Sequence, residues 1–113
     1  MRIDSYDFGK IIIDGVTYTS DVILLEEQVN SSWWRKESHL LESADLEDVV
    51  QANPEFLVIG TGRSGVMKVP QETQEFLRSK GIVFVIEKTG DACRTYNQYA
   101  RERKVAAALH LTC

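Results

Sequence analysis

Residues 56–86 read FLVIGTGRSGVMKVPQETQEFLRSKGIVFVI, and this stretch decides the fold class. Its two apolar runs, 56–59 and 82–86, have the length of buried strands and are too short for buried helices. Between them, Pro70 is typical of a helix start and Gly81 of a helix end. A strand, a helix and a strand in this order predict a parallel pair joined by a crossover, which is nearly always right-handed.

The sequence on either side of this stretch adds further strands and helices. Asp14-Gly15 predicts a hairpin turn within 8–18, because both residues tolerate the positive φ that a two-residue turn requires. The other expected elements are a strand over 21–25, a helix between Ser43 and Asn53, a helix over 89–104 and a strand over 105–111. We therefore expect one α/β domain over 1–113 with three layers: a mostly parallel central sheet, helices on its faces and the N-terminal β-hairpin as an added layer.

Composition and charge exclude several classes of protein. The 113 residues are 43% hydrophobic and 27% charged, which is typical of one globular domain rather than a disordered chain. The net charge of −4 argues against nucleic acid and against anionic membrane surfaces, because both attract basic proteins. No apolar run approaches the roughly 20 residues of a membrane helix. The N-terminus also lacks an apolar signal segment, so we expect a cytoplasmic location.

A glycine-rich motif, GTGRSG at Gly60–Gly65, follows the first strand of the central stretch. It matches the GxGxxG pattern of dinucleotide-binding folds, and Glu87 lies near the end of the next strand, as the acidic residue of that fingerprint does. In that fingerprint, however, the helix begins inside the motif, whereas here it begins at Pro70. The context therefore argues against a dinucleotide site.

Two interpretations of this loop stay open. Free backbone amides in a glycine-rich turn form a site for anions, and Arg63 would add positive charge at the sheet edge where α/β proteins bind ligands. In the other interpretation the turn only reverses the chain. The ligand hypothesis rests on five loop residues, namely Gly60, Thr61, Gly62, Arg63 and Ser64.

The cysteines and histidines form no spacing that is typical of a metal site, so we predict neither a metal nor a cofactor. Cys93 falls in the first turn of the third helix, where the helix dipole favours a thiolate. Asp91 would oppose that charge, and no histidine lies nearby in the sequence to act as a base. The alternative is a small buried side chain, which is how a free cysteine usually behaves.

The segment Trp33-Trp34-Arg35 also has two interpretations. Tryptophan and arginine dominate the binding energy of protein interfaces, so the segment predicts an exposed recognition surface. The same residues would equally suit a strand that covers a core. The sequence does not separate these alternatives.

Three stretches resemble one small family of α/β domains. They are LVIGTGRSGVMKVPQETQEFLRSKGI at 57–82, AC-x-TYN at 92–97 and AALHLTC at 107–113. The family is the Mth-type domain family, with an adipogenesis-associated cytosolic branch and a branch of mitochondrial complex I assembly factors; the chain looks like a stand-alone, archaeal-type member. Trp34, Arg35 and His39 look like features of the first branch. The positions that match the family are Gly60, Gly62, Cys93, Asn97, His110 and Cys113.

The resemblance implies a mixed central sheet with one strand antiparallel to the rest, and it supplies no established reaction, cofactor or catalytic residue. Its characterised branches act through partners. The first hypothesis is therefore a non-enzymatic binding, assembly or regulatory module, with a protein partner or self-association, whose contact residues are Trp33, Trp34, Arg35 and His39. The alternative is a small-molecule or anion binder, and conceivably an enzyme, that uses the Gly60–Gly65 loop together with Cys93 and Asn97.

Overall fold

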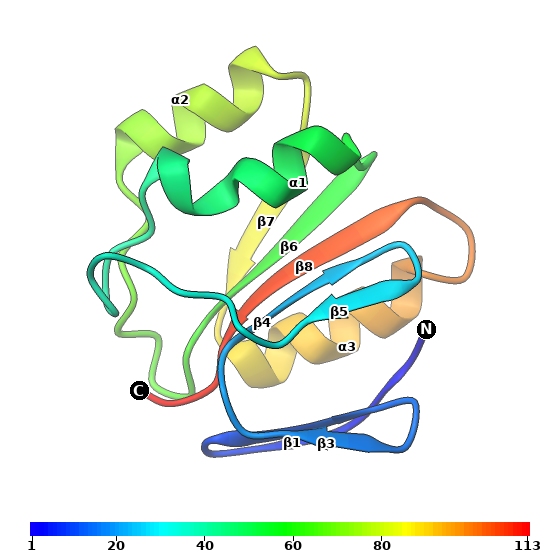
Figure 1. Ribbon diagram of the computed structural model, residues 1–113. Coiled ribbons are helices and arrows are strands. Elements are labelled where there is room, and N and C mark those ends of the chain that lie inside the picture. The colour runs from blue at the N-terminus through cyan, green and yellow to red at the C-terminus, as the bar shows by residue number, and fades with distance from the viewer.

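The computed structural model describes all residues from 1 to 113 and contains two β-sheets and four helical segments (Figure 1). The smaller sheet has the order β1-β2-β3, with strands β1 (Ile3–Asp7), β2 (Lys10–Ile13) and β3 (Val16–Tyr18). The larger sheet has the order β5-β4-β8-β6-β7, with strands β4 (Val22–Leu25), β5 (Gln28–Asn30), β6 (Phe56–Thr61), β7 (Val83–Glu87) and β8 (Val105–His110). The helices are the 3-10 helix η1 (Ser43–Leu46), α1 (Glu47–Ala52), α2 (Gln71–Ser79) and α3 (Thr89–Tyr99).

The larger sheet is mixed, as the family resemblance implied. Strand β6 runs parallel to both β7 and β8, whereas β4 runs antiparallel to both β8 and β5. Strand β4 is therefore the one strand that opposes the rest. The expected α/β fold class, with its mostly parallel central sheet, is confirmed.

The layers follow from two apolar cores, one on each face of the larger sheet. Helices α1 and α2 cover one face, and α3 covers the other face together with the smaller sheet (Figure 1). Alternating residues of β6 point to opposite cores: Val58 packs toward α3, and Leu57 and Ile59 pack toward α1 and α2. Because both faces are covered, β6 and β8 are buried along their whole lengths.

The N-terminal hairpin is confirmed and extended by a strand that the sequence did not predict. Asp14 and Gly15 adopt φ values of 49° and 80° at the turn, and Ile13 pairs with Val16. Strand β1 then pairs with β2 on the other side, although it is polar and buries only Ile3. It lacks the clear apolar alternation by which a strand is recognised.

Two expectations about the remaining elements are corrected. The run at 82–86 was expected to be a buried strand, but β7 lies at the edge of the sheet, with Val83 58% exposed. The third helix ends at Tyr99 rather than near Lys104, because residues 100–103 turn and the Lys104 ammonium donates to the Ala52 carbonyl. No helix has the length and apolar character needed to cross a bilayer.

Candidate functional site

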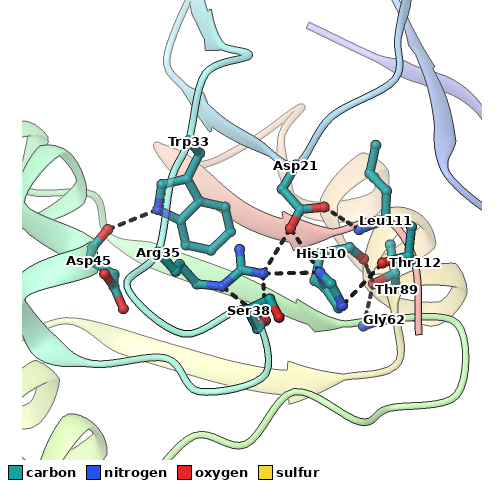
Figure 2. A network of polar contacts seen from close by, with 10 residues as sticks. All are labelled: Asp21, Trp33, Arg35, Ser38, Asp45, Gly62, Thr89, His110, Leu111 and Thr112. Carbon is teal, nitrogen blue, oxygen red and sulfur yellow. Dashed lines mark hydrogen bonds and ion pairs between the residues drawn. The ribbon is translucent and has the colours of Figure 1, made fainter.

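A buried polar network lies where β4 begins and β8 ends (Figure 2). Asp21 Oδ2 is 2.8 Å from Arg35 Nη2 and 2.8 Å from His110 Nδ1, and Asp21 Oδ1 accepts a hydrogen bond of 2.7 Å from the Leu111 amide. Arg35 also donates to the Ser38 carbonyl through Nε and Nη2. We call these groups the Asp21 network. It joins three segments that are far apart in the sequence.

The charge state of Asp21 follows from its partners. Burial disfavours the carboxylate, but the hydrogen bonds from His110, the Leu111 amide and Arg35 together outweigh burial, so the pKa of Asp21 lies below its usual value. Because the ionised Asp21 carboxylate can only accept, His110 Nδ1 is assigned as the protonated nitrogen that donates to it at 2.8 Å, and the contact of Nδ1 with the donor-only Arg35 Nη2 at 3.1 Å is then not a hydrogen bond. Asp21 is therefore an ionised acceptor at neutral pH.

An aspartate bonded to a histidine supplies two of the three members of a catalytic triad. The geometry here is nevertheless that of a structural network. His110 Nε2 lies 3.5 Å from Thr112 Oγ1, too long for an activating hydrogen bond to a nucleophile. The imidazole is also buried, and Arg35 already occupies the carboxylate. The arrangement holds segments together, and we assign it no catalytic role.

Sequence reasoning missed Asp21 altogether and gave no role to His110 beyond its match to the family. A usable signal was present in the last strand, where His110 follows a run of small apolar residues. A polar side chain at a buried strand position needs a partner. The sequence does not say which acidic residue provides it, because Asp21 is 89 positions away.

In the segment from Trp33 to His39, the first three residues alternate between buried and exposed, and residues 36–39 are all exposed. Trp33 is buried, and its indole Nε1 donates to the Asp45 carbonyl at 2.9 Å. The guanidinium of Arg35, also buried, lies 4.6 Å from the centre of the Trp33 ring. Trp34, between them, is 76% exposed. His39 is exposed as well, and its ring meets His110 edge-to-face at 5.5 Å.

These positions separate the four residues that were expected to bind a partner. Trp33 and Arg35 are structural, which matches the interpretation of a segment that covers a core. Trp34 and His39 are at the surface, which matches the interpretation of a recognition surface. The segment is not a strand, and recognition through Trp34 and His39 stays a prediction.

The amides of the glycine-rich loop are mostly used inside the molecule. Gly62 N donates to Thr89 Oγ1 at 2.8 Å, Arg63 N to the Thr112 carbonyl at 2.7 Å and Gly65 N to the Gly62 carbonyl at 3.3 Å. The expectation of free amides in a nest is therefore wrong for these three residues. The physical reason is that Thr89 and residue 112 lie against the loop and accept from Gly62 N and Arg63 N, while the Gly65 amide bonds within the loop itself.

Gly62 is needed for this close approach. It adopts a φ of +106°, and a Cβ at this position would lie 2.3 Å from the carbonyl carbon of Cys113. The Thr61 hydroxyl is also engaged, since it donates to the Glu87 carbonyl. Arg63 and Ser64 remain at the surface, with Arg63 paired to the exposed Asp7 at 2.8 Å.

Cys93 and Asn97 lie on α3 and face the smaller sheet. Burial raises the pKa of the Cys93 thiol to about 12, which outweighs any help from the helix dipole. Asn97 makes two hydrogen bonds to the backbone of Ile3, as donor and as acceptor, and so attaches β1 to α3. The two residues line a different surface hollow from Arg63, so the structure does not bring the expected ligand residues together.

Comparison with known proteins gives a family and a fold. The family model described as "Protein of unknown function (DUF498/DUF598)" matches residues 3–110. A relative from Xenopus tropicalis, named NADH dehydrogenase (ubiquinone) 1 alpha subcomplex assembly factor 3, is 29% identical over 111 residues, covering 96% of this chain and 59% of the relative. The chain thus spans less than two thirds of the length of that relative.

Solved structures show the same fold. A conserved hypothetical protein from Pyrococcus horikoshii superimposes with a TM-score of 0.86 at 20% identity, covering 100% of both chains. A Mth938-like domain from Bordetella pertussis superimposes with a TM-score of 0.68 at 23% identity, covering 97% of this chain and 85% of that one. The resemblance to the Mth-type family, including its assembly-factor branch, is confirmed.

Proposed function

Because the chain belongs to the DUF498/DUF598 family of proteins of unknown function, and because its relatives include proteins named as assembly factors, we propose that it is a non-enzymatic protein-binding module that acts in assembly or regulation. The observation that carries the proposal is Trp34, a large apolar side chain that is 76% exposed. Tryptophan is among the residues that contribute most to binding between proteins.

The backbone around Trp34 supports this role because both of its neighbours are anchored. Trp33 is held by its hydrogen bond to Asp45, and Arg35 by the ion pair with Asp21. A side chain presented from a fixed backbone loses less conformational entropy when it binds. Trp34 is therefore already positioned to contact a partner.

The exposed residues that follow Trp34 are polar and would form the rim of such a contact. They are Lys36, Glu37, Ser38 and His39. An aromatic anchor with a polar rim is the usual composition of a protein interface. The mixture of charges favours another protein over nucleic acid, which requires a continuous basic surface.

The test is affinity purification of the tagged chain from cells that naturally express it, with quantitative mass spectrometry of the bound proteins. We expect Trp34→Ser to lose the specific partner by at least tenfold, since a central tryptophan contributes roughly 2 kcal/mol or more. Phe8→Ser is the matched control, because Phe8 is also an exposed aromatic residue, 55% exposed, and belongs to the smaller sheet's β1–β2 turn. Equal recovery with both variants, or no protein above the tag-only background, would overturn the proposal.

A second candidate function, binding of a small anion, is supported by one hollow beside the glycine-rich loop. Arg63, Lys88 and Gly90 line it, and Gly90 lies in the first turn of α3. Asp7 and Asp91 line the same hollow and oppose an anion. A thermal shift with inorganic phosphate that disappears in Lys88→Ala would support this function, and an unchanged melting temperature would rule out phosphate as its ligand.

We also propose a cytoplasmic location. Both cysteines are free thiols, as a reducing compartment maintains them. Fractionation of the native cells with an antibody against the chain would test this, and recovery in a mitochondrial or exported fraction would contradict it.

A further inference from the structure

Strand β7 forms an edge of the larger sheet with mainly apolar side chains, and one of them, the Phe84 ring, has the Arg78 guanidinium 5.3 Å from its centre. It is the outermost strand beside β6, and two of its side chains are exposed, Val83 at 58% and Ile86 at 37%. Natural proteins usually blunt such edges with lysine, proline or a bulge. The sequence of β7, VFVIE, has no proline or lysine, and its register with β6 is regular along its whole length.

The opposite edge of the same sheet is protected. Strand β5 has only three residues, with polar Gln28 and Asn30 on either side of Val29. A short polar edge offers few backbone groups and little apolar surface to a second chain. Only β7 therefore combines length and apolar character at an edge of this sheet.

The orientation of the backbone shows which residues of β7 have free groups. The Glu87 carbonyl accepts from the Thr61 hydroxyl at 3.0 Å, so Glu87 directs its backbone toward β6. Successive residues of a strand direct their backbone groups to opposite sides. Phe84 and Ile86 therefore direct their N–H and C=O groups outward, and neither makes a backbone bond outside the sheet ladders.

We propose that β7 pairs antiparallel with β7 of a second copy, which joins two five-stranded sheets into one continuous sheet. In such a pair, outward-facing residues must face each other. Phe84 then lies opposite Ile86 of the second copy, and Val85 lies opposite its own counterpart on the two-fold axis. Among the registers that this rule allows, this one pairs all five residues of β7.

The same register makes the side chains complementary. The pairs of Phe84 with Ile86 are apolar and lie on the face that carries α2, and the central pair of valines lies on the face that carries α3. Glu87 faces Val83, so no like charges meet. A segment that fits a copy of itself in this way satisfies the self-complementarity that a two-fold interface requires.

The interface is small, so the expected dimer is weak. Specific protein interfaces bury about 800 Å² per partner, and one five-residue strand with its flanking side chains supplies less than that. We therefore expect a dissociation constant on the order of 10–100 µM. The exposed Trp34 is not part of this surface, so the dimer would leave the proposed partner site free.

Sedimentation velocity on the full chain, from about 1 µM to about 1 mM, tests the proposal. We expect a reversible monomer–dimer equilibrium that Ile86→Lys weakens at least tenfold, because it places a charge in the apolar pair. Val16→Lys is the matched control: like Ile86, Val16 is an exposed β-branched apolar residue, 51% exposed, but it lies on an edge strand of the smaller sheet. It should leave the dimer unchanged, as should Trp34→Ser.

Two further measurements keep the test decisive if Ile86→Lys fails to fold. Ile86→Pro removes only an outward N–H, which edge strands tolerate, and should abolish the dimer with circular dichroism unchanged. In a Cys113→Ser background, Val85→Cys should form an intermolecular disulfide on mild oxidation, whereas Val83→Cys, which faces Glu87, should not.

Three outcomes would overturn the proposal. One is a wild-type chain that stays monomeric over the whole concentration range. Another is equal dimerisation of the Ile86→Lys and Val16→Lys variants. The third is a monomeric chain whose Ile86→Lys variant alone loses a co-purifying protein, since that result would assign the edge to a strand of a different partner.

Discussion

The segment 33–39 and the loop 60–65 lie close to the same end of the central sheet and are held there by different interactions. The segment is attached mainly through two side chains: Arg35 reaches the half-buried Asp21, and the indole of the buried Trp33 donates to the Asp45 carbonyl. The loop is attached by backbone amides that bind carbonyl groups and the Thr89 hydroxyl. Attachment through a side chain leaves the next residue free to project, whereas attachment through the backbone uses up the groups that would bind a ligand. This difference is why we assign recognition to the segment.

The largest expected loss of stability comes from removing the Arg35 side chain, which attaches the segment 33–39. Arg35→Met should lower the free energy of unfolding by about 2–3 kcal/mol, because the half-buried Asp21 carboxylate loses its ion-pair partner and keeps only the hydrogen bonds from His110 and the Leu111 amide. Urea unfolding followed by tryptophan fluorescence measures the change. The control is Arg94→Met, which breaks the exposed ion pair with Asp91 and should change stability by less than about 1 kcal/mol. Similar losses in both variants would show that the network is not what holds the segment.

The next largest loss of stability is expected when the backbone contacts of the loop 60–65 are disturbed. Gly62→Ala should destabilise the fold by about 2–3 kcal/mol, since the positive φ is strained for alanine and the new Cβ would collide with Cys113. Gly15→Ala separates the two causes, because Gly15 has a φ of +80° and nothing within 4 Å of the added Cβ. We expect a loss of about 1 kcal/mol there, from backbone strain alone. An equal loss at both positions would mean that the close approach of Cys113 is unimportant.

Acid should weaken the segment's attachment and leave the loop's attachment unchanged. The pKa of Asp21 is lower in the folded chain than its usual value of 3.8, so the stability it contributes is present above that value and is lost as the pH falls through the folded pKa. In urea unfolding between pH 7 and pH 3, the difference between wild type and Asp21→Asn should shrink below about pH 4. A constant difference would show that the charge of Asp21 is not involved. The loop's hydrogen bonds join neutral groups, so Gly62→Ala should show the same loss at every pH.

The smallest changes in stability are expected when an exposed residue of either region is substituted. Trp34→Ser and Arg63→Ala should each change the free energy of unfolding by no more than about 0.5 kcal/mol, because neither side chain is buried. Differential scanning calorimetry measures both. A loss above about 1 kcal/mol for Trp34→Ser would mean that the indole packs on the chain and is not available to a partner.

The sequence predicted what depends on neighbouring residues. The strands and the helix of 56–86 and the turn at Asp14-Gly15 are specified by apolar runs and by local backbone preferences, and the structure contains them. The place of each strand in the sheet is not specified locally, which is why β7 was expected to be buried and lies at an edge.

The candidate site was harder to predict, because its groups come from distant parts of the chain. Arg35 and His110 are 75 positions apart, and no local pattern marks their contact. The glycine motif at 60–65 was visible, but its amides are taken up by Thr89 and by residues 112–113. The alternation of Trp33, Trp34 and Arg35 between core and surface also depends on partners, Asp45 and Asp21, that the sequence does not connect to them.

The position of β8 has a consequence for how the chain folds. It is the last strand along the chain, yet it lies between β4 and β6, and it alone connects the N-terminal part of the larger sheet to the parallel part. Until residues 105–110 are in place, the two parts share no backbone hydrogen bonds within that sheet. Contacts so distant in sequence slow folding, and a ribosome would have to release this strand before the sheet could close. Closure of the larger sheet should therefore be a late step of folding, and until then the edges of β4 and β6 that β8 covers stay exposed.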